Sequence, residues 1–78
     1  MNEHQKAQAW RRKMGWSIDQ LSELSGYSVS SIWWMERGEV APSASRGVRP
    51  VNEFAWQRYK RVCAAVDHEQ KTGKTFDW

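Results

Sequence analysis

Two short helix-forming stretches flank a glycine within residues 17–38, and this pattern limits the possible folds more than any other feature of the sequence. Ser17 and Gln20 have the spacing of a capping box, in which each side chain binds a backbone N–H group at the start of a helix. The first stretch is therefore predicted to be helical over residues 18–24. Gly26 follows it and supplies the positive φ that a tight turn between two helices requires.

The second stretch has a start and an end signal of its own. Ser28 can cap a helix over residues 29–37, and Gly38 can end it. Two short helices joined by a glycine turn meet the requirements of a helix-turn-helix. Because such helices cross steeply, large side chains must fill the space between them and against the helix that precedes them. The side chains expected there are Leu21, Tyr27, Ile32 and Met35.

Helical periodicity is also found on both sides of this segment. Asn2 can cap a first helix, in which Ala7, Trp10 and Met14 form a buried stripe. A last and longest helix is predicted over residues 51–69, where apolar side chains recur at steps of three and four. Those side chains are Val51, Phe54, Ala55, Tyr59, Val62, Cys63 and Val66.

The length of 78 residues allows a single small domain. Residues 1–70 are expected to form this domain, and residues 71–78 are expected to be a C-terminal tail. Residues 39–50 contain two prolines and a glycine, which predicts a loop, and no part of the chain has a strand pattern. The expected fold class is therefore all-α: a small domain of four helices, of which the last is long.

The formal charge of +3 at pH 7 comes from residues 41–78, because the charges of residues 1–40 cancel. This surplus is compatible with a polyanionic partner. The longest uncharged run, residues 24–35, is too short to span a bilayer, and Cys63 alone forms no intramolecular disulfide. We therefore expect a cytoplasmic protein without membrane contact. The two histidines lie near opposite ends, so no metal, cofactor or enzymatic activity is expected.

The sequence of residues 17–38, Ser-Ile-Asp-Gln-Leu-Ser-Glu-Leu-Ser-Gly-Tyr-Ser-Val-Ser-Ser-Ile-Trp-Trp-Met-Glu-Arg-Gly, resembles the phage Cro and repressor-like (XRE-type) helix-turn-helix. The likeness extends over residues 7–42. It implies a lambda-repressor-like domain that regulates transcription, as a homodimer on a two-fold operator in double-stranded DNA. In such families an arginine of the first helix pairs with a glutamate at the end of the third, which here implies a structural pair of Arg11 and Glu36.

The resemblance also implies a DNA-binding surface, because the second helix of such a motif enters the major groove. Carried over position by position, the groove-facing residues are Ser28, Val29, Ser30, Trp33 and Trp34. Arg37 is implied to lie near a phosphate. Arg46 and Arg49, in the segment that follows, are further candidates for phosphate contacts.

The implied groove face departs from the family pattern in its chemistry. Ile18 stands where members commonly have a phosphate-binding glutamine, and the face has no Asn, Gln, Arg or Lys to read bases. Trp33 and Trp34 instead offer the kind of aromatic anchor that is enriched in protein interfaces. Two functions stay open: a sequence-specific DNA-binding repressor or autoregulator, and a helix-turn-helix repurposed to bind another transcription regulator as an antiactivator or co-regulator.

Six tryptophans in so short a chain form the other unusual feature. Trp10 and Trp16 are expected to build the core around the first two helices. Trp56 lies off the main apolar stripe of the last helix and is expected to cover the 39–50 segment or to lie in a dimer seam. Together with Tyr59 it makes the long last helix the expected homodimer interface.

Overall fold

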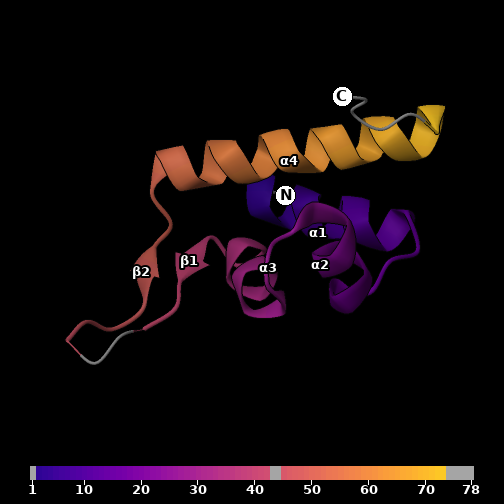
Figure 1. Cartoon of the computed structure of the whole chain (residues 1–78). Coiled ribbons are helices and arrows are strands. Elements are labelled where there is room, and N and C mark those ends of the chain that lie inside the picture. Colours follow the sequence, from indigo (N-terminus) through magenta and orange to yellow (C-terminus); the bar gives the residue numbers. More distant parts are fainter. Residues whose placement is uncertain (1, 43–44, 74–78) are drawn as a thin grey trace.

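The computed structural model describes residues 2–42 and 45–73, and Figure 1 shows its architecture. In this part of the chain the helices are α1 (Glu3–Lys13), α2 (Ile18–Ser25), α3 (Val29–Met35) and α4 (Glu53–Thr72). Two short strands, β1 (Glu39–Val40) and β2 (Arg49–Pro50), lie between α3 and α4. The expected small helical fold with a long last helix is confirmed.

Side-chain caps determine where the first two helices begin. The Oδ1 atom of Asn2 accepts a hydrogen bond of 2.8 Å from the backbone N–H of Gln5, whose side chain accepts one from Asn2 in return. Ser17 and Gln20 form the predicted capping box in the same way. Gly26 ends α2 in the left-handed conformation, with φ of 82°. The turn between α2 and α3 is thus built as the sequence predicts.

The boundaries of α4 differ from the predicted range because of a cap that the periodicity conceals. Asn52 accepts a hydrogen bond from the backbone N–H three residues later, so the helix begins at Glu53 and Val51 lies outside it. At its other end α4 continues to Thr72, so the first residues of the expected tail are helical. Residues 74–78 of that tail lie outside the described residues.

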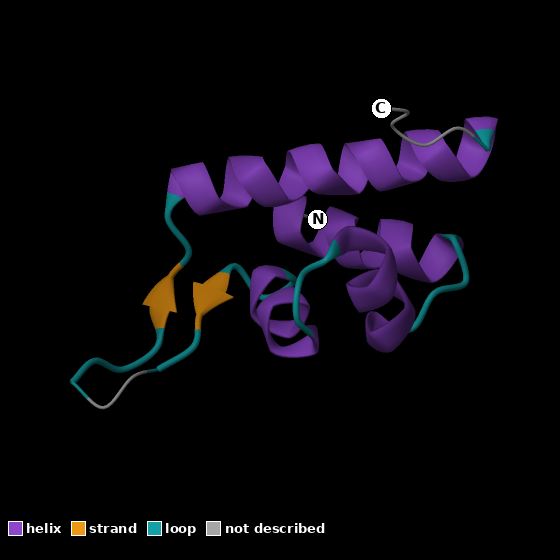
Figure 2. Cartoon of the chain, in the orientation of Figure 1, coloured by secondary structure: helices purple, strands orange, loops and turns teal. Residues whose placement is uncertain are grey.

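Residues 39–50 are not the plain loop that the sequence predicts. β1 and β2 pair antiparallel, with Glu39 opposite Pro50. The backbone N–H of Val51 donates to the carbonyl of Gly38 at 3.0 Å and closes the base of this hairpin. Figure 2 shows the hairpin projecting away from the helices. The prolines of this segment favour a loop prediction, yet Pro50 lies in β2, because an edge position in a two-stranded sheet tolerates a residue without an N–H group.

The helices enclose one small core. α4 runs along one edge of the molecule, with α1 beside it, and it also contacts α2, which packs against α3 (Figure 1). The buried apolar side chains of the core are Leu21, Ile32, Trp56, Tyr59 and Val66. Trp10 and Trp16 pack against it edge to face, with ring centroids 5.5 Å apart, in agreement with their expected place.

The side chains that α4 turns toward the core also differ from the prediction. Trp56 and Tyr59 are only 3% and 1% exposed, so neither is available as a dimer seam. Phe54, which the sequence places on the buried stripe, is 86% exposed. Around a helix of 3.6 residues per turn, Phe54 stands about 140° from Tyr59 and Trp56 only about 60°. Trp56 therefore belongs to the core, and Phe54 faces solvent.

Candidate functional site

A buried ion pair ties the end of α3 to α1. The Nε atom of Arg11 donates to Oε2 of Glu36 at 2.6 Å, and Nη2 donates to Oε1 at 3.0 Å. The two side chains are only 9% and 1% exposed. This two-pronged arrangement matches the fork of the guanidinium to both carboxylate oxygens and is the strongest form of such a pair. The pair that the resemblance implies is thus present in the structure.

Arg11 makes a third contact, because its Nη1 atom donates to the carbonyl of Trp16 at 2.9 Å. Hydrogen bonding to Glu36 raises the pKa of Arg11 above its ordinary value, so the guanidinium stays charged. Loss of either partner leaves a charge that is buried and unpaired, which is strongly destabilising. Arg11 and Glu36 therefore position α3 and are not themselves open to a ligand.

His4 forms a second contact between α1 and the end of α3. Its Nδ1 atom lies 2.9 Å from the carbonyl oxygen of Met35, and its ring packs on that of Trp56 with centroids 4.0 Å apart. Gly38 passes so close that a Cβ atom there would lie 2.7 Å from Cδ2 of His4. The sequence assigns His4 no role, because its hydrogen-bond partner is 31 positions away and no local pattern links them.

The N-terminal turn of α3 is open to solvent. Ser28, Val29 and Ser30 are all exposed, and Val29 presents 43% of its surface. The hydroxyl of Ser28 accepts a hydrogen bond from the backbone N–H of Ser31 and so caps the helix. Three of the predicted site residues therefore lie together at the end of α3 that is opposite to Glu36.

Farther along α3, two tryptophans and an arginine form a continuous surface. Trp33 and Trp34 pack edge to face with centroids 4.7 Å apart; Trp33 is 38% exposed and Trp34 is half-buried. The guanidinium carbon of Arg37 lies 3.3 Å from the centroid of the Trp33 ring, and Nη1 donates to the Trp33 carbonyl at 3.2 Å. We call Trp33, Trp34 and Arg37 the Trp–Arg cluster. Its arginine rests on α3 and does not extend freely into solvent.

The hairpin carries the other two predicted site residues. Arg46 and Arg49 are exposed, and Val48 between them is 48% exposed. Within residues 2–42 and 45–73 no carboxylate forms an ion pair with either guanidinium. Because the hairpin projects from the helical body (Figure 2), both arginines are free to contact an anionic partner beyond α3.

Other chemistries find little support in the described residues. No three His, Cys, Asp or Glu side chains of this part of the chain are grouped as a metal site would need. Burial raises the pKa of Cys63 to about 11, so its sulfur is protonated and a poor nucleophile at neutral pH. None of the described helices combines the length and the apolar character that crossing a membrane requires.

Comparison with known proteins places these features in a family. The model of a helix-turn-helix domain matches residues 6–70. The matched range includes the glycine turn, the pair of Arg11 and Glu36, the hairpin and most of α4. Searches of the curated proteins and of the solved structures found no match. Since the family model covers most of the sequence, the chain belongs to the helix-turn-helix domain family.

Proposed function

We propose that the protein is a cytoplasmic, sequence-specific DNA-binding transcription regulator, a small repressor or autoregulator that inserts α3 into the major groove. The observation that carries this proposal is the exposed N-terminal turn of α3, whose other end is held by the buried pair of Arg11 and Glu36. In a helix-turn-helix the N-terminal residues of the second helix meet base edges. Ser28 and Ser30 then bind phosphate or base atoms, and Val29 contacts a thymine methyl group.

The hairpin supplies positive charge for the DNA backbone. Arg46 and Arg49 have no carboxylate partner among the described residues, so a phosphate does not have to displace one. Each phosphate contact releases a condensed counterion and lowers affinity as the salt concentration rises. In this proposal the hairpin fixes the position of the domain on the duplex, while α3 reads the sequence.

The test is a fluorescence-anisotropy titration with a duplex of the promoter upstream of the gene. Between about 50 and 200 mM salt, the logarithm of the binding constant is expected to fall linearly with the logarithm of salt concentration. Arg46→Ala and Arg49→Ala should each make this slope shallower by about 1. Arg58→Ala and Arg61→Ala serve as matched controls, because these arginines are exposed on α4.

Two results would contradict the DNA proposal. One is no binding of the promoter duplex even at the lowest salt concentration. The other is an equal change of slope in the hairpin variants and in the α4 controls, because Arg58 and Arg61 lie on a different element from α3 and the hairpin. In that case the salt dependence reflects total charge and not a specific arrangement of phosphate contacts.

The Trp–Arg cluster supports a second candidate function, the binding of another transcription regulator. Trp33 is exposed and stacked with Arg37, and α3 offers no amide or free cation on this face to read a base. Tryptophan and arginine are the residues most enriched where truncation weakens protein interfaces. The protein then acts as an antiactivator or co-regulator that docks through α3.

This candidate predicts a different pattern of mutant effects. Isothermal titration with the purified regulator encoded by a neighbouring gene should show binding that Trp33→Ala weakens by at least about 2 kcal/mol. Arg46→Ala should change that affinity little. If Trp33→Ala abolishes promoter binding and the neighbouring regulator does not bind, DNA is the ligand of α3.

We also propose that the protein acts as a homodimer on a two-fold operator. Helix-turn-helix domains commonly bind paired half-sites in this way. With Trp56 and Tyr59 buried in the core, the most exposed of the large apolar side chains among the described residues is that of Phe54, on the first turn of α4. Phe54 replaces them as the proposed contact between protomers.

A further inference from the structure

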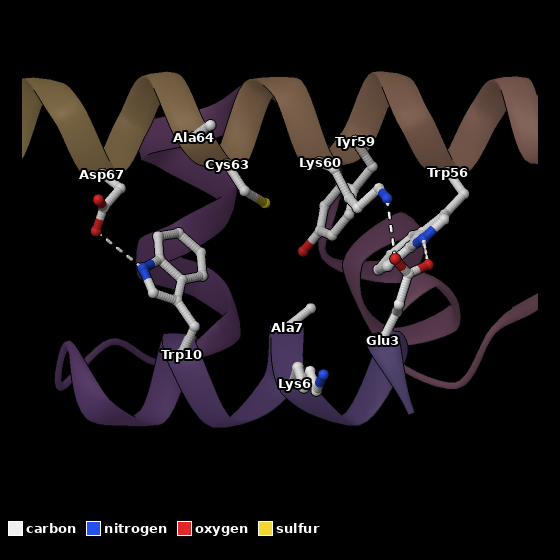
Figure 3. A pocket seen from close by; sticks show the side chains of 10 residues that line it. All are labelled: Glu3, Lys6, Ala7, Trp10, Trp56, Tyr59, Lys60, Cys63, Ala64 and Asp67. Atoms are coloured by element: carbon white, nitrogen blue, oxygen red, sulfur yellow. Dashed lines mark hydrogen bonds and ion pairs between the residues drawn. The ribbon is translucent and has the colours of Figure 1, made fainter. Parts of the chain in front are cut away.

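Two apolar side chains stand out from α3 on the face that the DNA proposal turns toward the duplex. Val29 and Trp33 are four residues apart, so they lie on the same side of the helix, and they are 43% and 38% exposed. Trp33 is the only tryptophan of the described residues with this exposure. Trp10 and Trp56, by contrast, lie between α1 and α4 and donate to carboxylates there (Figure 3).

The polar groups of this face discriminate poorly between bases. The hydroxyl of Ser28 donates to the hydroxyl of Ser31 at 2.9 Å, so its proton is engaged within α3. Arg37 lies over the Trp33 ring and donates to the Trp33 carbonyl, so it covers the indole and does not extend toward a base. The Ser30 hydroxyl and the Trp33 indole each offer a single donor, and the purines of both kinds of base pair present an N7 acceptor.

Duplex DNA is the partner that the neighbouring charges favour. Arg46 and Arg49 lie on the hairpin that directly follows α3, and no carboxylate of the described residues pairs with them. In the major groove of such a duplex the base edges offer one apolar group, the C5-methyl group of thymine. An apolar face on α3 and a methyl group on the base edge are therefore complementary.

The spacing along α3 fits two such groups. Four residues of helix rise about 6 Å, which corresponds to about two base steps of about 3.4 Å. Val29 and Trp33 can therefore each pack on the methyl group of a different thymine. Burial of one methyl group corresponds to about a fourfold change in the binding constant, so two contacts correspond to more than about tenfold.

We propose that α3 selects its site on DNA by C5-methyl groups of pyrimidines, which pack against Val29 and Trp33, and not by hydrogen bonds to base edges. This inference rests on the proposed DNA-binding function and names the feature of the duplex that α3 recognises. Thymine carries the group in ordinary DNA, and 5-methylcytosine carries it at the same ring position in a C·G pair. Two forms of synthetic DNA test these sources separately.

The first test replaces thymine by uracil. The promoter duplex is amplified with dUTP in place of dTTP, which removes every C5-methyl group and keeps every base pair and phosphate. In a fluorescence-anisotropy titration the native protein should bind the uracil duplex at least about tenfold more weakly than the thymine duplex. The salt dependence should be the same for both, because the phosphate contacts are unchanged.

Two exposed valines provide matched variants. Val29 lies on α3, whereas Val48 lies on the hairpin and is 48% exposed. Val29→Ser should lower the ratio of the thymine to the uracil binding constant about fourfold, and Val48→Ser should leave it unchanged. Trp33→Ala should lower the ratio by at least a similar factor. Each ratio compares two duplexes with one protein preparation, so a partly unfolded variant does not distort it.

The second test uses a duplex made only of G·C pairs, with either cytosine or 5-methylcytosine in every position. It contains no thymine, so any gain on methylation comes from the methyl groups of cytosine. The native protein is expected to bind the methylated duplex at least about fourfold more tightly. Val29→Ser should show a smaller gain, whereas Val48→Ser should show the full gain.

The possible failures are distinguishable. If the protein binds neither form of the promoter duplex at about 50 mM salt, the DNA-binding proposal fails, and this inference fails with it. Equal binding of the thymine and uracil duplexes would leave DNA binding in place and overturn only the reading of methyl groups. The same conclusion would follow from equal ratios for the Val29 and Val48 variants, or from no gain on cytosine methylation.

Discussion

Gly38 is a residue whose identity two independent constraints require. Its φ is 72°, and a Cβ atom there would meet the ring of His4, whereas Gly26 has φ of 82° and nothing within 4 Å. Gly26→Ala should lower the free energy of unfolding by about 1 kcal/mol through the backbone alone, and Gly38→Ala should cost more. Urea denaturation measures both. The excess should shrink when His4→Ala is added to Gly38→Ala; equal losses for the two glycines would contradict the contact.

The pair of Arg11 and Glu36 should behave as one unit. Arg11→Met or Glu36→Leu alone leaves a buried unpaired charge and is expected to lower the free energy of unfolding by about 3 to 5 kcal/mol. The double variant, Arg11→Met with Glu36→Leu, should be more stable than either single variant, because it buries no charge. A double-mutant cycle from chemical denaturation checks this. Additive losses would mean that the two side chains contribute independently.

At the scale of elements, the caps predict where α2 and α3 begin, although α3 ends at Met35 and not at the predicted residue 37. Ser17 and Gly26 define α2 in this way, and the structure agrees. The start of α4 is misjudged because Val51 continues the apolar spacing although it precedes the Asn52 cap. Counting from Val51 places Phe54 on the buried face, which is the error that the structure corrects.

The hairpin and the contacts between α1 and α4 could not be predicted from local sequence patterns. Strands of two residues are too short to show an alternating pattern. In residues 39–50 the prolines and the glycine are therefore the only visible signal, and they predict a loop. The hydrogen bonds of Trp10 to Asp67 and of Trp56 to Glu3 join residues more than fifty positions apart. The family resemblance therefore points to the exposed turn of α3 and to its positioning pair, but no pattern in the sequence points to these contacts between α1 and α4.

The contacts between α1 and α4 predict how stability depends on pH. Hydrogen bonds from Trp56 and then from Lys60 lower the pKa of Glu3 below its ordinary 4.5, and Trp10 and then Lys71 do the same for Asp67, below 3.8. A carboxyl group with a lowered folded-state pKa stabilises the fold above its unfolded pKa. This stabilisation is therefore expected to be lost as the pH falls through 4.5 and on through the lower folded-state values.

Phenylalanine variants isolate this effect. Trp56→Phe and Trp10→Phe remove the N–H donors, so the loss of stability between about pH 5 and pH 3 should be smaller than in the native protein. Trp33→Phe is the control, since no described carboxylate accepts a hydrogen bond from that indole. Urea denaturation at a series of pH values gives the slopes. Parallel profiles for all four proteins would exclude the two carboxylates as the source.

At the scale of the whole molecule, the proposed homodimer depends on Phe54. Phe54→Ser is expected to convert a dimer to a monomer in sedimentation equilibrium at micromolar concentration. It should change the free energy of unfolding of the protomer by no more than about 0.5 kcal/mol, because the side chain is exposed. Leu24→Ser, at an exposed position of α2, is the control. A native protein that is already monomeric at high concentration would remove the dimer from the proposal.

The place of α4 in the core has a consequence for how the protein is made. Three of the five buried apolar side chains belong to α4, and two indole hydrogen bonds join it to α1. A nascent chain that has emerged only as far as the hairpin can bring Arg11 to Glu36, but it lacks the buried side chains of α4 that complete the core around Leu21 and Ile32. Folding therefore awaits the synthesis of α4, so a chain released before α4 is complete should be a target for degradation and not a partly active regulator.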